Sequence, residues 1–184
     1  SFNNKICGNN ISLNSDGGIS LSISSDSNIS ENALISNDDG ISLYGSFNNN
    51  IYHNNFVRNT NQWYSHGSAN VWDNGVEGNY WDDYDGVDLD HDGIGNRWYE
   101  IDENNTDRYP LMGMFHSFET SLGYYVNVIS NSTIEDFEYF EPNRTIRMRI
   151  SNVTENQTFG FCRVCIPKDL MSPPYTVIID DGLT

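Results

Sequence analysis

Basic residues, cysteines and long apolar runs are all scarce in this sequence. Lys and Arg together number nine against 26 Asp and Glu, which gives a formal net charge of −17 in 184 residues. A surface of that sign repels phosphate, so we expect no nucleic-acid partner. No apolar run approaches the roughly 18 residues that a membrane helix needs, so we expect no membrane span in this segment.

The three cysteines do not suggest a metal site or a disulfide. Cys162 and Cys165 belong to a CxxC within a strand-like run, where residues three apart point to opposite faces. That geometry favours neither zinc binding nor a disulfide. We expect these two residues and Cys7 to be buried, unreactive thiols.

Alanine is also rare at the start of the chain, and this region contains a sequence repeat. Residues 1–60 contain one alanine among long runs of Ser and Asn, which compete poorly for helical backbone. Residues 18–59 instead repeat at a spacing of 22. The matched pairs are Gly18 and Gly40, Ile19 and Ile41, Leu21 and Leu43, Asn28 and Asn50, Ile29 and Ile51, Asn32 and Asn54, and Asn37 and Asn59. A period in the twenties indicates stacked supersecondary units, and the leucine-dense consensus of leucine-rich repeats is absent.

Each repeat has the pattern of strands joined by turns. Ile19, Leu21 and Ile23 alternate with serines, which places them on one face of a strand. The Asn, Asp, Ser and Gly residues between the strands are turn formers. We therefore predict a parallel β-helix whose coils stack at about 4.8 Å.

The recurring asparagines admit two interpretations. In such a solenoid Asn28 would lie above Asn50, and Asn32 above Asn54. They could form side-chain amide ladders between the coils, or they could serve only as turn formers.

The solenoid is expected to extend beyond this segment. Three coils would be only about 15 Å tall, and an open solenoid edge must be covered by neighbouring coils or a cap. We expect residues 1–115 to be the C-terminal coils and the capping segment of a longer solenoid.

Seven N-x-S/T sequons favour an extracellular setting and are candidate glycosylation sites. They are Asn10, Asn28, Asn104, Asn131, Asn143, Asn152 and Asn156. Four of the seven fall between residues 131 and 158, which favours a glycosylated C-terminal part.

The segment after residue 60 is acidic and aromatic. All four tryptophans fall in 63–98, and twelve of the 26 acids fall in 73–107. Within it, Asp88, Asp90 and Asp92 belong to a DxDxDG loop. Carboxylates at positions 1, 3 and 5 of such a loop converge on one point, and Ca²⁺ is the hard cation that they favour. The sequence therefore predicts a calcium site, with a solvated acidic loop as the alternative.

The loop differs from an EF-hand, because no helices flank it and position 12 is Tyr99. The carbonyl of Ile94 at position 7 and the side chain of Asn96 at position 9 are expected ligands. We expect the remaining ligands to come from nearby acids. The candidates are Asp82, Asp83 and Asp85 upstream and Glu100 and Asp102 downstream.

The aromatic residues around the loop also admit two roles. They could form a platform on which sugars stack, or a plug that covers the last coil. We favour the plug, because an exposed solenoid end must be covered by bulky side chains. Trp72, Tyr80 and Trp81 are its expected members.

Four motifs in this segment carry a family resemblance. They are Asn79–Tyr84 (NYWDDY), Asp88–Gly95 (DLDHDGIG), Tyr99–Ile101 (YEI) and Asp107–Met112 (DRYPLM). They resemble the closing segment of NosD-like right-handed parallel β-helix proteins, solenoids of the carbohydrate-binding and sugar-hydrolase (CASH) type that are abundant on archaeal cell surfaces. The resemblance covers residues 1–115 and implies a secreted or surface-anchored right-handed β-helix. It leaves the activity open, since such proteins include binding, structural and polysaccharide-cleaving members.

Residues 116–184 form a second expected domain after a linker at Pro110–Phe118. Its strand-like runs are Tyr124–Ile129, Phe137–Phe140, Thr145–Ile150, Phe159–Ile166 and Tyr175–Ile179. Five short strands at this spacing predict a small all-β sandwich of immunoglobulin-like type. A strand would still be missing from it, so we expect further residues or another chain to complete the sheet.

Catalysis is not expected from these residues. A polysaccharide lyase needs a Lys or Arg base beside its bound substrate, and the coils offer only Lys5 and Arg58, out of phase with the repeat. A hydrolase needs paired carboxylates at a cleft, and Asp16, Asp38 and Asp39 fall at turn positions.

We therefore expect a non-catalytic, calcium-stabilised structural or adhesion protein of the cell surface. Self-association or other cell-surface proteins would supply its partners. The alternative is a carbohydrate-binding or polysaccharide-cleaving module, which would have a polysaccharide as its partner.

Overall fold

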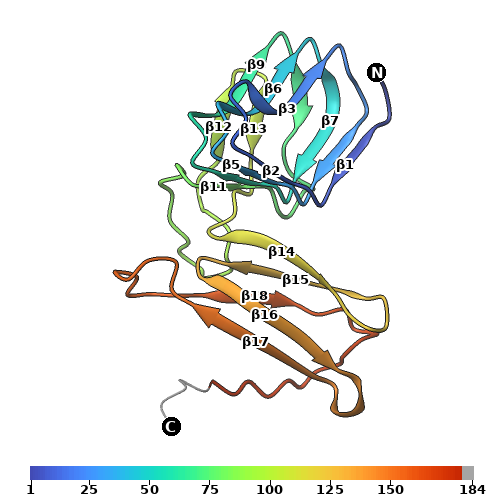
Figure 1. Cartoon of the computed structure of the whole chain (residues 1–184), viewed down its shortest axis with the longest axis vertical. Coiled ribbons are helices and arrows are strands. Elements are labelled where there is room, and N and C mark those ends of the chain that lie inside the picture. The colour runs from blue at the N-terminus through green and yellow to red at the C-terminus, as the bar shows by residue number, and fades with distance from the viewer. Residues whose placement is uncertain (180–184) are drawn as a thin grey trace.

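The structure, a computed structural model that describes residues 1–179, has two parts arranged end to end (Figure 1). Stacked parallel coils form a β-solenoid, and an antiparallel β-domain follows them. The solenoid strands are β1 (Lys5–Cys7), β2 (Asn10–Ser12), β3 (Gly17–Ser22), β4 (Asn28–Ser30), β5 (Ala33–Ile35), β6 (Asp39–Tyr44), β7 (Phe47–Tyr52), β8 (Asn55–Val57), β9 (Asn61–His66), β10 (Ala69–Val71) and β11 (Tyr80–Trp81). The expected all-β architecture is confirmed.

Three parallel sheets run along the solenoid, in the orders β1-β4-β7-β10, β2-β5-β8-β11 and β3-β6-β9. Ile19 pairs with Ile41, and Leu21 pairs with Leu43. All four side chains are buried in one core inside the coils. The spacing of 22 residues is therefore the length of one coil, as the repeat predicted.

The solenoid continues beyond residue 60, where the sequence repeat ends. Strand β9 pairs with β6, β10 with β7 and β11 with β8. The sequence repeat, from which three coils were expected, therefore ends one turn before the solenoid does. The repeat is lost because the last turn packs against the aromatic cap, so Trp63 replaces the isoleucine of Ile19 and Ile41 in its row.

Asparagine side chains join successive coils in columns. In one column each Nδ2 and each backbone N–H donates to the Oδ1 of the asparagine in the next coil, at 2.9–3.1 Å. The columns are Asn9–Asn32–Asn54–Asn79, Asn14–Asn37–Asn59 and Asn49–Asn70–Asn105. A satisfied hydrogen bond of this kind contributes about 1 kcal/mol net, and losing one partner of a buried pair costs more.

The ladder expectation is confirmed for Asn32 and Asn54 but wrong for Asn28 and Asn50. Asn28 pairs with Asn50 in strand register, yet its Nδ2 donates to the Tyr52 hydroxyl at 3.4 Å. Asn28 lies within strand β4, whereas Asn32 and Asn54 lie at corners between strands. At a corner the side chain supplies the hydrogen bonds that the turning backbone lacks.

Each column ends at a carboxylate of the capping segment. The first passes from Asn79 to Asp107, and the third from Asn105 to Asp102. The second reaches Asp82 through an intervening glutamine. A carboxylate only accepts hydrogen bonds, so it matches the direction in which the amides donate.

Aromatic rings close the last coil. Trp72 and Trp81 are fully buried, and Trp81 stacks on Phe56 at 4.2 Å and on Tyr99 at 4.3 Å. The hairpin β12 (Tyr99–Asp102) and β13 (Asn105–Asp107) completes the cap. Trp72 and Trp81 thus form the plug that we favoured, whereas Tyr80 packs toward the β-domain.

The β-domain is a two-layer sandwich, as expected. Its strands are β14 (Met114–Glu119), β15 (Tyr125–Ser130), β16 (Thr133–Phe140), β17 (Thr145–Ser151) and β18 (Cys162–Cys165), and the 3₁₀ turn η1 (Glu141–Asn143) joins β16 to β17. Strands β14, β15 and β18 form one antiparallel sheet, and β16 and β17 form the other. Val126 and Val128 are buried in the core that side chains of both sheets share.

Three expected boundaries in this part differ from the structure. The expected linker at Pro110–Phe118 is partly a strand, because residues 114–119 pair with β15 as strand β14, so the boundary expected at 115/116 falls inside a strand. Strand β18 is shorter than the expected run Phe159–Ile166. Residues 175–179, which were expected to form a strand, pair with no strand of the described chain.

Two further expectations concern the cysteine thiols and membrane insertion. All three cysteines are free and half-buried rather than buried. Burial raises the pKa of Cys162 and of Cys165, so their thiols stay protonated and weakly reactive. Among residues 1–179, no helix is long and apolar enough to cross a membrane.

Asp107 should give the solenoid a characteristic pH dependence. Burial raises the pKa of this carboxyl to about 7, and hydrogen bonds from Trp81, Asn79 and Tyr109 oppose the shift only in part. The unfolded carboxyl titrates near 3.8, so between about pH 4 and 7 the folded protein binds more protons than the unfolded chain. The Asp107 contribution to the free energy of unfolding should therefore decrease as the pH rises through this range.

Asp107→Asn should remove this contribution to the pH dependence of the unfolding free energy, measured by urea denaturation from pH 5 to 7. Asp102→Asn is the matched control. Burial alone would raise the pKa of Asp102, but its hydrogen bonds to Ser65, Asn104 and Asn105 lower it, so that variant should keep the slope. An unchanged slope in Asp107→Asn would contradict the prediction.

Candidate cation loop and the junction between the two parts

The acidic loop 88–96 is folded by its own side chains. Asp88 accepts hydrogen bonds from the backbone N–H groups of Asp92 at 3.2 Å and Gly93 at 2.9 Å. Asp92 accepts one from the N–H of Ile94 at 2.8 Å. Gly93 has a φ of 83°, a left-handed conformation that glycine adopts at little cost and that turns the chain sharply.

Three carboxylates converge in this loop. Asp88, Asp90 and Asp92 each present an oxygen atom, and the three oxygens lie within 4.8 Å of one another. Asp88 is half-buried and the other two are exposed. Within residues 1–179, Asp90 makes no side-chain hydrogen bond, so its carboxylate adds charge to the cluster without holding the loop together.

The other expected ligands are occupied elsewhere. Asn96 accepts a backbone N–H from the opposite side of the loop. Asp83 accepts the Tyr99 hydroxyl at 3.1 Å, and burial raises the pKa of Asp83. Asp85 pairs with the exposed Arg97.

The remaining candidates serve the cap. Glu100 is exposed on β12, and Asp82 and Asp102 terminate asparagine columns. Ile94 forms a single bridge with Leu111. Among the described acids, then, the structure gathers only the three DxDxDG aspartates into one group.

The loop is packed against the β-domain. A Cβ atom at Gly93 would lie 3.4 Å from Arg163 and 3.5 Å from Phe161. The Gly93 carbonyl accepts the N–H of Met112 at 3.0 Å. Ile94 and Phe161 flank an apolar cluster centred on Leu111, Phe115 and Ile129. Ordering the loop therefore also orders the contact between the solenoid and the β-domain.

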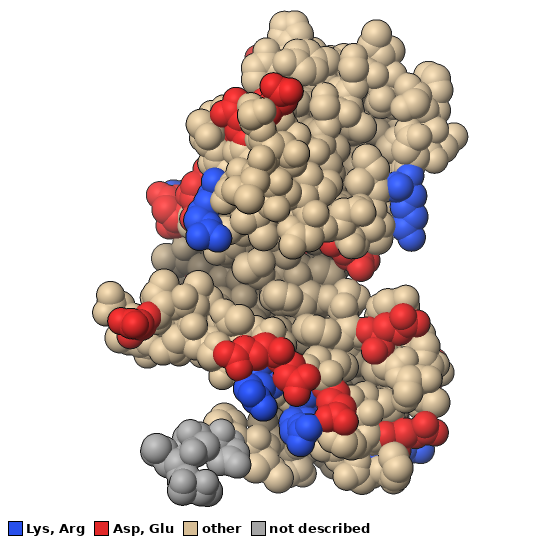
Figure 2. Space-filling view, in the orientation of Figure 1, with Lys and Arg blue, Asp and Glu red and all other residues tan. Residues whose placement is uncertain are grey.

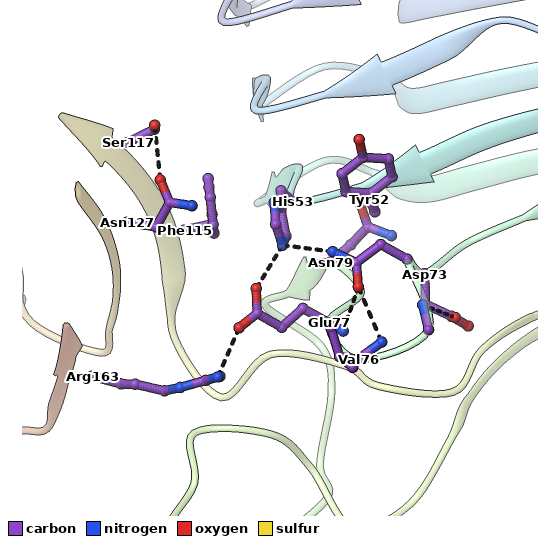
Figure 3. Close-up of polar contacts among 12 residues, drawn as sticks. Tyr52, His53, Asp73, Val76, Glu77, Asn79, Phe115, Ser117, Asn127 and Arg163 are labelled. Atoms are coloured by element: carbon purple, nitrogen blue, oxygen red, sulfur yellow. Dashed lines mark hydrogen bonds and ion pairs between the residues drawn. The ribbon is translucent and has the colours of Figure 1, made fainter. Parts of the chain in front are cut away.

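Next to this loop, His53, Glu77 and Arg163 form a polar group that we call the junction cluster (Figure 3). His53 Nε2 lies 2.8 Å from Glu77 Oε2, and Arg163 Nη2 lies 2.9 Å from Glu77 Oε1. The His53 ring stacks on Phe115 at 3.9 Å. The hydrogen bond from His53, followed by the charge of Arg163, lowers the pKa of Glu77 despite burial. Glu77 thus stays ionised and joins a solenoid corner to strand β18.

A second contact fixes the same junction. Asn55 Oδ1 accepts the N–H of Phe115 at 2.8 Å, and Asn55 Nδ2 donates to the Phe115 carbonyl at 2.8 Å. This amide pairs with the backbone of β14 as a neighbouring strand would. The sequence analysis did not identify the junction, because its members are far apart in the chain and belong to no repeat or motif.

Two clefts adjoin the cap. One, of about 540 Å³, is lined by Asp83, Tyr84, Asp85, Trp98, Tyr99 and Glu100 among others. The second, of about 560 Å³, lies on the other side of Asp83 and Tyr99 and includes Arg58 and Trp63. Trp98, which belongs neither to the plug nor to the core of the coils, is 61% exposed at the first cleft.

The asparagines of the predicted sequons differ in their solvent exposure. Asn10, Asn104, Asn143 and Asn156 are exposed, and Asn152 is exposed with its amide on the Gln157 carbonyl. Asn28 and Asn131 are only partly exposed, and both use their side chains in hydrogen bonds. A glycan attached to either of these two would displace contacts that hold the fold.

Comparison with known families supports the solenoid assignment. Residues 1–86 match the family model described as periplasmic copper-binding protein (NosD). The solenoid part of the chain is therefore similar to the NosD family. The NosD match extends from β1 to the end of β11, and the acidic loop and the β-domain lie outside it. No curated protein and no solved structure matches the chain significantly.

Glu77→Gln should loosen the junction while leaving the solenoid core intact. The variant keeps the shape of the side chain but removes the charge that Arg163 pairs with, so we expect a loss of about 1–3 kcal/mol of unfolding free energy. A double-mutant cycle with Arg163→Met should give a coupling energy at pH 7. Because the pKa of Glu77 is lowered from 4.5, the coupling should be present above pH 4.5 and disappear as the pH falls below it. Additive effects at pH 7 would show that the pair does not stabilise the junction.

Proposed function

We propose that this chain is a non-catalytic, calcium-stabilised structural or adhesion segment of a surface protein. The observation that carries the proposal is the convergence of Asp88, Asp90 and Asp92 within 4.8 Å. Their loop lies where the cap of the solenoid meets the β-domain, so a cation bound there would stiffen both the cap and the junction. A rod of stacked coils with one rigid end suits a spacer or an adhesin better than it suits a mobile catalyst.

Calcium fits the donor set better than copper does. The matched family is named for copper binding, and copper sites favour imidazole, thiolate or thioether ligands. Among residues 1–179, the DxDxDG aspartates are the one group of three or more His, Cys, Asp or Glu side chains, and all of its donors are oxygens. Oxygen donors of this kind fit a hard cation such as Ca²⁺, with the Ile94 carbonyl and water as further ligands.

A location outside the cytoplasm agrees with this proposal. The family description is of a periplasmic protein, and five of the seven sequons are exposed. Placement on a cell surface, glycosylation and an archaeal source are parts of the proposal that rest on the sequence motifs.

Self-association is the kind of partnership that we propose for the β-domain. Val177, Ile178 and Ile179 are 81–91% exposed and extended. Exposed apolar chain of this kind can add as a strand to an open sheet edge. Strand β17 offers such an edge, since it pairs only with β16 among the described strands.

Calcium should raise the melting temperature of the protein, because a ligand that binds only the folded state stabilises it by mass action. The gain is about 2.7 kcal/mol at a free concentration 100 times the Kd. Asp90→Ala should abolish the gain from calcium. Without calcium the same variant should melt no lower than the parent, because Asp90 holds no part of the loop.

Glu103→Ala, which removes an exposed acid outside the cluster, is the matched control and should respond to calcium as the parent does. Thermal melts in chelator, Ca²⁺ and Cu²⁺ separate the candidate metals. A melting curve that calcium leaves unchanged, or a response to calcium that survives in Asp90→Ala, would refute the calcium site.

The proposed self-association should appear in sedimentation velocity at high protein concentration with calcium present. Replacing Val177 and Ile179 with Asp should return the protein to a monomer, since two charges would be placed in the added strand. Val153→Asp, at an exposed apolar position in a loop, is the control and should leave the association unchanged. A parent protein that stays monomeric at every concentration would refute the proposal.

A further inference from the structure

Two tyrosines interrupt the serine-lined outer face of the sheet β3-β6-β9. In one row Ser20 pairs with Ser42, and Ser42 pairs with Tyr64. In the next row Ser22 pairs with Tyr44, and Tyr44 pairs with His66. Serine therefore suffices at these positions to close a coil, and the two aromatic rings are additions that the solenoid does not need for folding.

The rings of Tyr44 and Tyr64 form one continuous surface. Their centroids lie 5.1 Å apart with an interplanar angle of 38°, and the residues are 43% and 41% exposed. Tyrosine presents a large apolar area with a polar tip and only two side-chain torsions to fix, so it gives binding area at low entropic cost. Exposed aromatic area that has no structural role is a sign of a binding surface.

Fixed hydrogen-bonding groups border these rings. The Asp39 carboxylate accepts the Ser42 hydroxyl at 2.8 Å and the Asn61 Nδ2 at 2.9 Å. Ser42, which donates to Asp39, pairs in strand register with Tyr64, so the carboxylate lies beside the tyrosine pair. Partial desolvation, followed by the charges of Tyr64 and Asp39, raises the pKa of Tyr44. Its remaining lone pairs, with the two phenol groups, offer acceptors and donors beside a flat apolar surface.

A pyranose sugar has the chemistry that matches this surface. Its C–H face is apolar and stacks on an aromatic ring, while its ring-edge hydroxyls donate to carboxylates and accept from phenols. Asp39 and the net charge of −17 would repel uronates and sulfated glycans. The ligand class is therefore a neutral glycan. We propose that Tyr44, Tyr64 and Asp39 form a binding site for a neutral pyranose glycan on the side of the solenoid.

This site would supply the adhesive contact, so the inference rests on the adhesion part of the proposed function. It does not depend on the calcium loop, because its residues belong to β6 and β9 rather than to the cap. The site is open and shallow, so its affinity comes from a few contacts repeated along a polymer.

Affinity electrophoresis in native gels tests the proposal with defined probes. The gels contain galactomannan, xylan or mixed-linkage β-glucan as neutral polymers, polygalacturonate as the anionic polymer, or no polymer, all with Ca²⁺. The variant is Tyr44→Ser with Tyr64→Ser, which installs the residues that neighbouring coils carry at these positions and should therefore fold. Tyr125→Ser, at an exposed tyrosine of the β-domain, is the matched control.

At least one neutral polymer should retard the parent and Tyr125→Ser, and the double variant should lose that retardation with an unchanged melting temperature. Equal retardation of parent and double variant, retardation by polygalacturonate alone, or no retardation in any gel would overturn the site. A normal calcium response with no retardation would remove the glycan site and leave the structural proposal standing. If the double variant melts lower, Tyr64→Ser alone, in the row where Ser20 and Ser42 precede it, provides the same comparison.

Discussion

The register in which coils of mostly 22 or 23 residues stack is the constraint on which the rest of this protein depends. It places Ile19 on Ile41 and Leu21 on Leu43, so one apolar column fills the interior of the rod. It also places one asparagine amide above another at the corners, where the backbone leaves strand pairing. The first coil is one residue longer, yet Ile6 still pairs with Ile29 and Asn9 still donates to Asn32, so the turns absorb the extra residue and leave both columns intact.

The core at the end of the solenoid is filled by different side chains from those in its middle. Repeating Leu and Ile give way to stacked Phe56, Trp81 and Tyr99, because the last coil has no neighbour to share its core. The segment that provides this cap also carries the DxDxDG loop and the side chain of Glu77, which contacts strand β18. Cap, acidic loop and domain junction are therefore one continuous structure, and a cation in the loop would act on all three.

The charge distribution follows the same division. In Figure 2 the solenoid face carries few charged side chains, whereas acidic and basic groups lie together on the β-domain. The pairs Glu138 with Arg147 and Glu77 with Arg163 belong to the second part or to its junction. The coils are held mainly by amides and apolar side chains, whose interactions depend little on ionic strength. Ion pairs, which salt weakens, lie in the capping segment, where Asp73 pairs with Arg108, at the junction and in the β-domain.

Much of the solenoid could be predicted from sequence, because its contacts are encoded locally and repeated. Ile41 and Leu43 show the period, and Asp88, Asp90 and Asp92 show the loop, each within a short window. The fourth turn could not be predicted, since β9 to β11 have lost the repeat while keeping the backbone path. The junction could not be predicted from the sequence either, because His53, Glu77 and Arg163 meet only once the two folded parts are in contact. Strand β14 was predicted as part of a linker, because its strand character depends on pairing with β15. The outer tyrosines were present in the sequence, but only the strand register shows that serines precede both of them in their rows.

The asparagine columns make the rod directional. Every amide in the column from Asn9 to Asn79 passes its hydrogen toward the capped end, and the last acceptor, Asp107, has no hydrogen to pass on when ionised. A further coil stacked beyond it would meet an acceptor where it also presents one. The ionised carboxylate, which the cap buries completely, therefore ends the donor-to-acceptor order of the column at this end of the rod.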